Sequence, residues 1–511
     1  MMTDEESQPP TELFAIPEPT VTFLPETDPA HPTVLLEPYH VDLLPEYDYI
    51  SQEYLISGAA QGHSYCTRLL LRRPADPARF SGFVVAEPSH LWGGTSIWRH
   101  VNRWVMRNAT RIDGTDLEEN ASNTTPAGGM NGIDHAWLEI DSQAPSAIGK
   151  LKNVDPERYA AMAFTPGPTC DEFSDNIPVA DGSEEEPLSK EQLWQAYDAF
   201  KAQWWPATTQ SPEILTAASH ALRAGLLGGL TARWVVLSGL SQTGGLTRRF
   251  ITHSGHLRLP DGEKAPFDGF LPCQSGGTVP LPDCVSGGKI FELLGESEFL
   301  SVRYPCGVSG QMHWERTAHR RPQSEGYRLY EVAGMGHRES RYFSAVDRVR
   351  WGERPSLPGV EESGEGEGEG VRWSTVANSF IYHAVFETMR RWIVEGGDGG
   401  FTPPDSVWIR TVGETDEIAR DRFGNASDGV RTLHTEVPVA IIVAATPRGR
   451  PNWYCGSEWP FTEEELLALY GSVAAYRRRA GVAIARQMKS GFLLPEDAEV
   501  LRRETVERVH F

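Results

Sequence analysis

Several features are absent from this 511-residue sequence, and each absence excludes a class of protein. It contains no run of 18 apolar residues, so no transmembrane helix is expected. The first residues, MMTDEESQPP, lack the basic and apolar segments of a secretory signal, which favours a cytoplasmic location. Six cysteines are few, and none forms a C-x-x-C pair. We therefore expect reduced thiols, although Cys273 and Cys284 flank one loop and could pair in a secreted chain.

Basic residues are also scarce relative to acidic ones. Lys and Arg total 47 against 70 Asp and Glu, which gives a net charge of −23. An acidic surface repels phosphate backbones and anionic lipids, so neither nucleic acid nor a membrane is an expected partner. No G-x-G-x-x-G follows the early strands and no H-E-x-x-H is present, so we expect no cofactor and no metal. The sequence does not indicate an oligomeric state.

The chain divides into three parts by composition. Residues 1–48 are rich in Pro, Glu and Thr and are expected to form an extended N-terminal arm. Residues 49–397 are expected to form the core, and residues 398–511 a C-terminal extension packed on it. Within the core, residues 99–133 and 145–211 are loop-like and rich in aromatic residues, which predicts cap insertions.

Tryptophans are concentrated in the second insertion, at Trp194, Trp204 and Trp205. They could form a small core that belongs to a covering subdomain. They could also line an apolar pocket that binds the substrate, and the two roles are compatible.

Short apolar runs predict a twisted, mainly parallel sheet flanked by helices, an α/β fold. The runs are 82–86 (GFVVA), 135–140 (HAWLEI), 233–238 (RWVVLS), 289–294 (KIFELL) and 327–333 (YRLYEVA). An antiparallel pair of strands is predicted within 49–74, with its turn at 58–62. Apolar residues at helical spacing predict helices over 214–224 and 374–395.

The most informative segment is 233–250, RWVVLSGLSQTGGLTRRF, in which a strand runs through Ser241 into a helix. A nucleophilic serine requires this arrangement, because it projects from a strained turn while N–H groups of the helix face the reacting oxygen. Thr243 occupies a position where glycine is usual, and Gly244 and Gly245 are expected to relieve the crowding. The alternative is a Gly- and Ser-rich loop that binds a phosphate or has no function.

A serine nucleophile needs a base and an acid. His337 follows the last predicted strand on a Gly-rich loop and is the expected base. The acid is expected after the strand 289–294, where both Glu296 and Glu298 stand. We favour Glu298, because it lies three positions after Gly295, beyond the turn of the chain.

Two backbone N–H groups are needed to stabilise the oxyanion. The N–H of Gln242 is the expected first donor. The second donor is expected in the loop after the strand 82–86, where Pro88 has no N–H and Ser89 or His90 is therefore the candidate.

Several strings along the chain resemble the alpha/beta hydrolase domain-containing proteins of bacteria and fungi. They are EYLISGAA (53–60), RRPADPARFSGFVV (72–85), DHAWLEIDSQ (134–143), LKNVDPERYAAM (151–162), SGLSQTGG (238–245), RLYEVAGMGH (328–337), RFGNASDGVRTLHTEVPVA (422–440) and GFLLPEDAEVLR (491–502). The family usually reads G-E-S-Q-S around its serine, so Leu240 and Thr243 depart from it. The resemblance implies an α/β-hydrolase fold and a serine hydrolase, mostly acting on carboxylic esters.

Together these observations predict a serine esterase that cleaves a small-molecule ester with an apolar part, through an acyl-enzyme on Ser241. Two alternatives remain open. The same residues could transfer an acyl group or cleave an amide or thioester. The chain could also be an inactive hydrolase fold that serves as a binding module.

Overall fold

The computed structural model describes most of the chain. The described residues are 12–37, 41–91, 94–95, 97–106, 134–165, 208–275, 280–300, 320–340, 372–397, 400–413, 417–444, 455–507 and 509–511.

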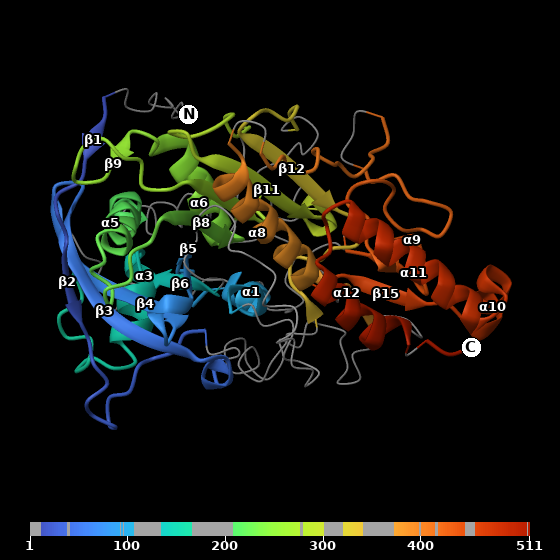
Figure 1. Ribbon diagram of the computed structural model, residues 1–511, viewed down its shortest axis with the longest axis horizontal. Helices are drawn as coiled ribbons and strands as arrows, with labels where there is room; N and C mark the ends of the chain where they lie inside the picture. Colours follow the sequence, from blue (N-terminus) through green and yellow to red (C-terminus); the bar gives the residue numbers. More distant parts are fainter. Residues whose placement is uncertain are drawn as a thin grey trace, which may run out of the picture.

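A ten-stranded sheet runs through the molecule (Figure 1). Its strand order is β12-β11-β10-β8-β5-β6-β4-β3-β2, and β7 pairs with β4. Neighbouring strands are parallel from β12 to β6 and antiparallel from β6 to β2. The strands are β2 (Thr20–Phe23), β3 (Tyr49–Ala60), β4 (His63–Pro74), β5 (Phe80–Pro88), β6 (Asp134–Ile140), β7 (Ala163–Phe164), β8 (Trp234–Leu240), β10 (Gly269–Cys273), β11 (Lys289–Gly295) and β12 (Tyr327–Val332).

Two smaller sheets accompany it. β1 (Phe14–Ala15) pairs with β9 (Leu257–Arg258), and β15 (Ser457–Pro460) lies between β13 (Arg372–Trp373) and β14 (Ala440–Val443). The α-helices are α1 (Ile97–Val105), α3 (Ala144–Ser146), α5 (Ser211–Arg223), α6 (Gln242–His253), α8 (Asn378–Glu395), α9 (Leu433–Glu436), α10 (Glu463–Tyr470), α11 (Val473–Lys489) and α12 (Pro495–Leu501). The 3-10 and π-helical turns are η1 (Leu44–Tyr47), η2 (Pro77–Arg79), η4 (Ala147–Lys152), η7 (Glu296–Leu300) and η10 (Arg502–Val506).

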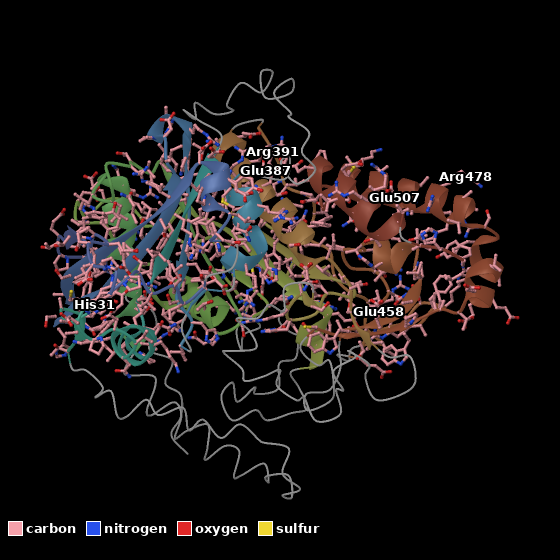
Figure 2. All side chains as sticks on the ribbon, turned by 90° about the horizontal axis from the view of Figure 1, so that it is seen from below. His31, Glu387, Arg391, Glu458, Arg478 and Glu507 are labelled. Atoms are coloured by element: carbon pink, nitrogen blue, oxygen red, sulfur yellow. The ribbon has the colours of Figure 1, made fainter. Side chains whose placement is uncertain are left out.

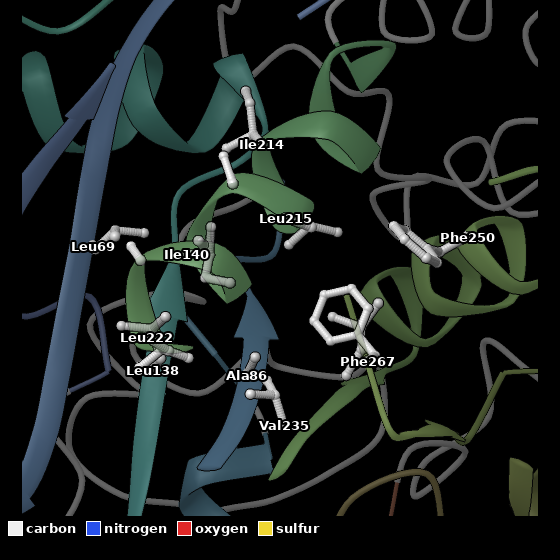
Figure 3. Packing of buried hydrophobic residues seen from close by; sticks show 14 of the residues in the cluster. Leu69, Ala86, Leu138, Ile140, Ile214, Leu215, Leu222, Val235, Phe250 and Phe267 are labelled. Atoms are coloured by element: carbon white, nitrogen blue, oxygen red, sulfur yellow. The ribbon is translucent and has the colours of Figure 1, made fainter. Parts of the chain in front are cut away.

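Hydrophobic cores lie on both faces of the main sheet, because successive residues of a strand point to opposite sides. On one face, Val235 belongs to a core that includes Ile214 of α5 and Phe250 of α6 (Figure 3). On the other face, Val236 belongs to a core that includes residues of α1 and α8, among them Trp98. A parallel sheet covered on both faces by helices is therefore the frame that positions the strand ends.

The sequence predicted most of this frame. The five apolar runs are β5, β6, β8, β11 and β12, and the antiparallel pair is β3 with β4. The two predicted helices are α5 and α8, with ends that differ by a few residues. The sequence pattern did not predict β10, a parallel strand inserted between β8 and β11. Among the described residues, no helix has the length and apolar character needed to cross a membrane.

The C-terminal residues contact the edge of the sheet. The N–H of Glu331 on β12 donates to Val407 O at 2.9 Å, and the N–H of Val430 donates to Glu331 O at 2.7 Å. The helices that follow occupy one end of the molecule, far from β3 and β4 (Figure 1). From below, Arg478 and Glu507 lie at that end and His31 lies toward the other (Figure 2). Chain far beyond β12 in sequence thus lies beside the strand that leads to His337.

Candidate active site

Ser241 sits at the junction of β8 and α6 in a backbone conformation that L-residues rarely adopt. Its φ is 61° and its ψ is −118°. Its N–H donates to Cys273 O at 3.0 Å, and its own carbonyl accepts from the N–H of Gly245 at 2.8 Å. Such strain persists only where surrounding structure enforces it, and it is concentrated at functional sites. The backbone therefore turns sharply at this serine, between a buried strand and a helix.

The turn depends on close contacts that only glycine allows. A Cβ on Gly239 would lie 2.3 Å from Thr243 O, and one on Gly244 would lie 2.6 Å from Cys273 O. Gly245 differs, because its nearest neighbour would be Ser275 Oγ at 3.6 Å. The glycines that the turn requires are thus two positions before and three positions after the serine.

Thr243 fits into this turn without crowding it. Its side chain is buried, and its Oγ1 lies 2.9 Å from Leu240 N and 3.0 Å from Leu240 O. The hydroxyl accepts from the N–H and donates to the carbonyl. Of the two glycines expected to relieve the crowding, only Gly244 is in close contact.

His337 lies in the loop after β12 and pairs with a carboxylate. Its Nδ1 is 2.8 Å from Glu298 Oε1, and the exposed fractions of the two side chains are 14% and 5%. Ser297 Oγ donates to the same carboxylate oxygen at 3.2 Å. The N–H of Ser297 also donates to Met335 O, which ties the two loops together. A buried carboxylate beside Nδ1 can fix the orientation of an imidazole ring.

Glu296 has different partners. Its side chain is fully buried, and Oε2 accepts from the N–H of Gly334 at 2.8 Å. Its Oε1 accepts from Arg420 Nη1 at 2.6 Å and from the N–H of Ala444 at 3.2 Å. These contacts join the loop after β11 to the C-terminal extension. Glu298 thus contacts His337, whereas Glu296 contacts Gly334 and the C-terminal extension. The sequence alone did not show this difference in contacts.

The loop after β5 differs from the expectation for the oxyanion donors. The N–H of Ser89 donates to Ile140 O at 2.9 Å, and that of His90 donates to Gly94 O at 2.7 Å. Neither N–H is available as the second donor in this structure, because each is already hydrogen-bonded. The next N–H along the loop, that of Leu91, donates to Gln242 Oε1 at 3.3 Å.

Gln143 connects this loop to the residue after the serine, and the sequence analysis did not single it out. Its Nε2 donates to Ser89 O at 2.8 Å and to Gln242 Oε1 at 3.2 Å. Its Oε1 accepts from Gln242 Nε2 at 2.9 Å. The available signal was its place three positions after the end of β6, since parallel strands end at one edge of the sheet.

Burial also affects the titration of the Cys273 thiol and the Tyr382 phenol. It raises the pKa of the Cys273 thiol, which is unpaired, as is that of Cys284. It also raises the pKa of the Tyr382 phenol, and the charges of Glu298 and Glu339 add to that effect. Burial thus favours the neutral form of both groups.

The remaining predicted residues are the three tryptophans of the second insertion. Trp194, Trp204 and Trp205 lie outside the described residues. Among the residues that the structure describes, no group of three or more His, Cys, Asp and Glu is placed to hold a metal ion.

Comparison with known proteins identifies the family. The model of a family described as "Alpha/beta hydrolase domain" matches residues 16–503. The chain therefore belongs to the alpha/beta hydrolase domain family, as the resemblance of its sequence strings predicted, and it has the α/β-hydrolase fold. No curated protein matches the chain.

The solved structures that resemble this chain share little sequence identity with it. A predicted dienelactone hydrolase of Klebsiella pneumoniae subsp. pneumoniae is 10% identical with a TM-score of 0.29, over 59% of this chain and 95% of that one. The esterase Est22 is 13% identical with a TM-score of 0.23, over 47% and 48%. A promiscuous CE15 esterase from a marine bacterial metagenome is 12% identical with a TM-score of 0.24, over 62% and 82%. At these TM-scores, the similarities carry no argument about activity.

Proposed function

We propose that this protein is a serine esterase that cleaves a carboxylic ester of a small molecule through an acyl-enzyme intermediate on Ser241. The observation that carries the proposal is the backbone of Ser241, with φ of 61° and ψ of −118° at the strand–helix junction. The pair formed by His337 and Glu298 supports it, because it supplies a base with an oriented imidazole.

Acylation follows from these groups. His337 removes the proton of Ser241 Oγ as that oxygen attacks the ester carbonyl, and Glu298 stabilises the imidazolium that forms. The N–H of Gln242, at the start of α6, donates to the oxyanion, because the first N–H groups of a helix have no acceptor within it. His337 then protonates the leaving alcohol.

Deacylation uses the same residues. Water enters in place of the alcohol, and His337 takes its proton as the oxygen attacks the acyl carbonyl. Collapse of the second tetrahedral intermediate returns the proton to Ser241 and releases the carboxylic acid. Ester, water, acid and alcohol therefore balance with no cofactor.

Replacement of the nucleophile tests the proposal. Ester turnover is measured with a panel of esters that vary in acyl and alcohol size, for the wild type and for Ser241→Ala. The variant should lose turnover by at least about 10³-fold while circular dichroism stays unchanged. Turnover in a folded Ser241→Ala that equals that of the wild type contradicts the proposal.

A further inference from the structure

Gln274 lies at the centre of the loops that carry the proposed active-site residues. It follows β10 directly, and its side chain is 1% exposed. The preceding carbonyl, Cys273 O, accepts from the N–H of Ser241 at 3.0 Å. The N–H of Gln274 donates to Leu293 O at 2.8 Å, and its φ of 45° turns the chain sharply. Its backbone is therefore fixed between the serine turn and the strand that leads to the acid loop.

The side chain of Gln274 joins the other two loops. Its Oε1 accepts from the N–H of Gly295 at 2.6 Å, and its Nε2 donates to Gly336 O at 2.9 Å. Gly295 ends the strand before the Glu298 loop, and Gly336 directly precedes His337. A single amide group thus spans the gap between the loop of the acid and the loop of the base.

The packing around this amide leaves little room for movement. A Cβ on Gly295 would lie 2.8 Å from Gln274 Nε2, and a Cβ on Gly336 would lie 2.4 Å from Cys455 O of the C-terminal extension. Gly336 O also accepts from Asn378 Nδ2 of α8 at 3.1 Å. Glycine at both positions lets the chain approach this closely.

We infer that Gln274 is a positioning residue, which sets the distance between the Glu298 and His337 loops and thereby aims the imidazole at Ser241. This inference rests on the proposed function. An amide offers an acceptor and a donor on two neighbouring atoms at the end of its side chain, and it carries no charge. A glutamate keeps the acceptor for Gly295 but places an anion against Gly336 O. A methionine has similar length and neither group.

Gln274→Met tests this role, with Gln323→Met as the matched control. Gln323 is exposed near the opposite end of β12, and it also bridges two groups, with Nε2 donating to Asp405 and Oε1 accepting from the N–H of Ser406. Turnover is measured per reactive serine, with the serine counted by a fluorophosphonate probe. Gln274→Met should lower kcat about 10- to 100-fold and change KM by less than about 3-fold, because misplaced catalytic groups lose rate rather than affinity. Gln323→Met should match the wild type.

Each remaining result supports or overturns the inference. If Gln274→Met does not fold, Gln274→Glu is measured instead, because glutamate keeps the side-chain length and the hydrogen bond from the N–H of Gly295. A fall in its kcat at constant KM supports the role. Unchanged kcat per reactive serine in either folded variant, or an equal loss in Gln323→Met, overturns it. Ser241→Ala is assayed alongside. If that variant retains full turnover, the proposed function fails together with this inference. If it is inactive and the Gln274 variants equal the wild type, only this inference fails.

Discussion

Ser241 is supported mainly by residues close to it in sequence, whereas His337 and Glu298 are supported by residues from distant segments. We call the loops after β5, β6 and β8 the nucleophile half, and the loops after β10, β11 and β12 the acid–histidine half. In the first, Gly239, Thr243 and Gly244 shape one turn, whose main contact outside its own segment is with Cys273 O at the end of β10. In the second, the support comes from the far parts of the chain, such as Arg420. A local turn can be predicted from its own sequence, and a tertiary network cannot.

The largest effect expected in the acid–histidine half is the loss of the carboxylate beside the base. Glu298→Gln should lower ester turnover about 10²- to 10⁴-fold, because His337 loses the anion that stabilises its imidazolium. The measurement is kcat/KM on the best ester of the panel, with the melting temperature as a check on folding.

Glu296→Gln is the matched control in the same loop. It should retain far more turnover but lower the free energy of unfolding, because it leaves Arg420 without a buried anion. If the greater loss of turnover occurs in Glu296→Gln, the roles of the two glutamates are reversed. If neither change lowers turnover, the acid comes from another segment.

Replacement of the two glycines of α6 by alanine tests how tightly the nucleophile half is packed. Gly244→Ala should lower the free energy of unfolding by about 1–3 kcal/mol, because the new Cβ collides with Cys273 O and Ser275. Gly245→Ala should be neutral or stabilising by up to about 1 kcal/mol, because alanine favours helix and the space is open. Chemical denaturation of both variants measures the difference. Equal stabilities would show that the contact at Gly244 does not constrain the turn.

The last effect is a pH dependence of the free energy of unfolding, which is spread over several pH units. Burial raises the pKa of Glu139 on β6 to about 7, although the nearby Arg68 lowers it. Between its ordinary pKa and this value, the folded protein holds a proton that the unfolded chain has lost. The free energy of unfolding should therefore fall as pH rises from about 4.5 to about 7, by at most about 1.4 kcal/mol per pH unit.

Glu139→Gln should remove this component. Denaturation curves at several pH values, compared between the wild type and the variant, measure it. Parallel pH profiles for the two proteins would contradict the assignment.

The amides of Gln274 and Asn378 carry no titratable group, so their contacts to Gly336 should hold across the same range.

The difference between the two halves explains what the sequence could predict. β5, β6, β8, β11 and β12 were predicted because each is a mostly apolar run, as expected for a strand that is buried on both faces. β10 was missed because it has only five residues, GFLPC, with Pro272 inside and no alternation. A glycine and a proline in so short a run argue against a strand when no neighbouring strands are known.

The candidate residues divide in the same way. Ser241 could be predicted because strand, turn and helix follow one another in a single segment. Gln274, Arg420 and Cys455 could not, because their contacts with Gly336 or Glu296 join residues that are far apart in sequence. Ser89 and His90 failed as donors for a related reason. Their N–H groups are engaged by partners that only the folded loop reveals.

Peptide mapping by mass spectrometry, after labelling with a fluorophosphonate, tests the central claim most directly. The probe forms a stable bond with a serine that a neighbouring base activates. The account predicts one adduct, on the peptide that contains Ser241, which is absent from Ser241→Ala and formed much more slowly in Glu298→Gln. An adduct on a different serine, or no adduct on the folded wild-type protein, would contradict it.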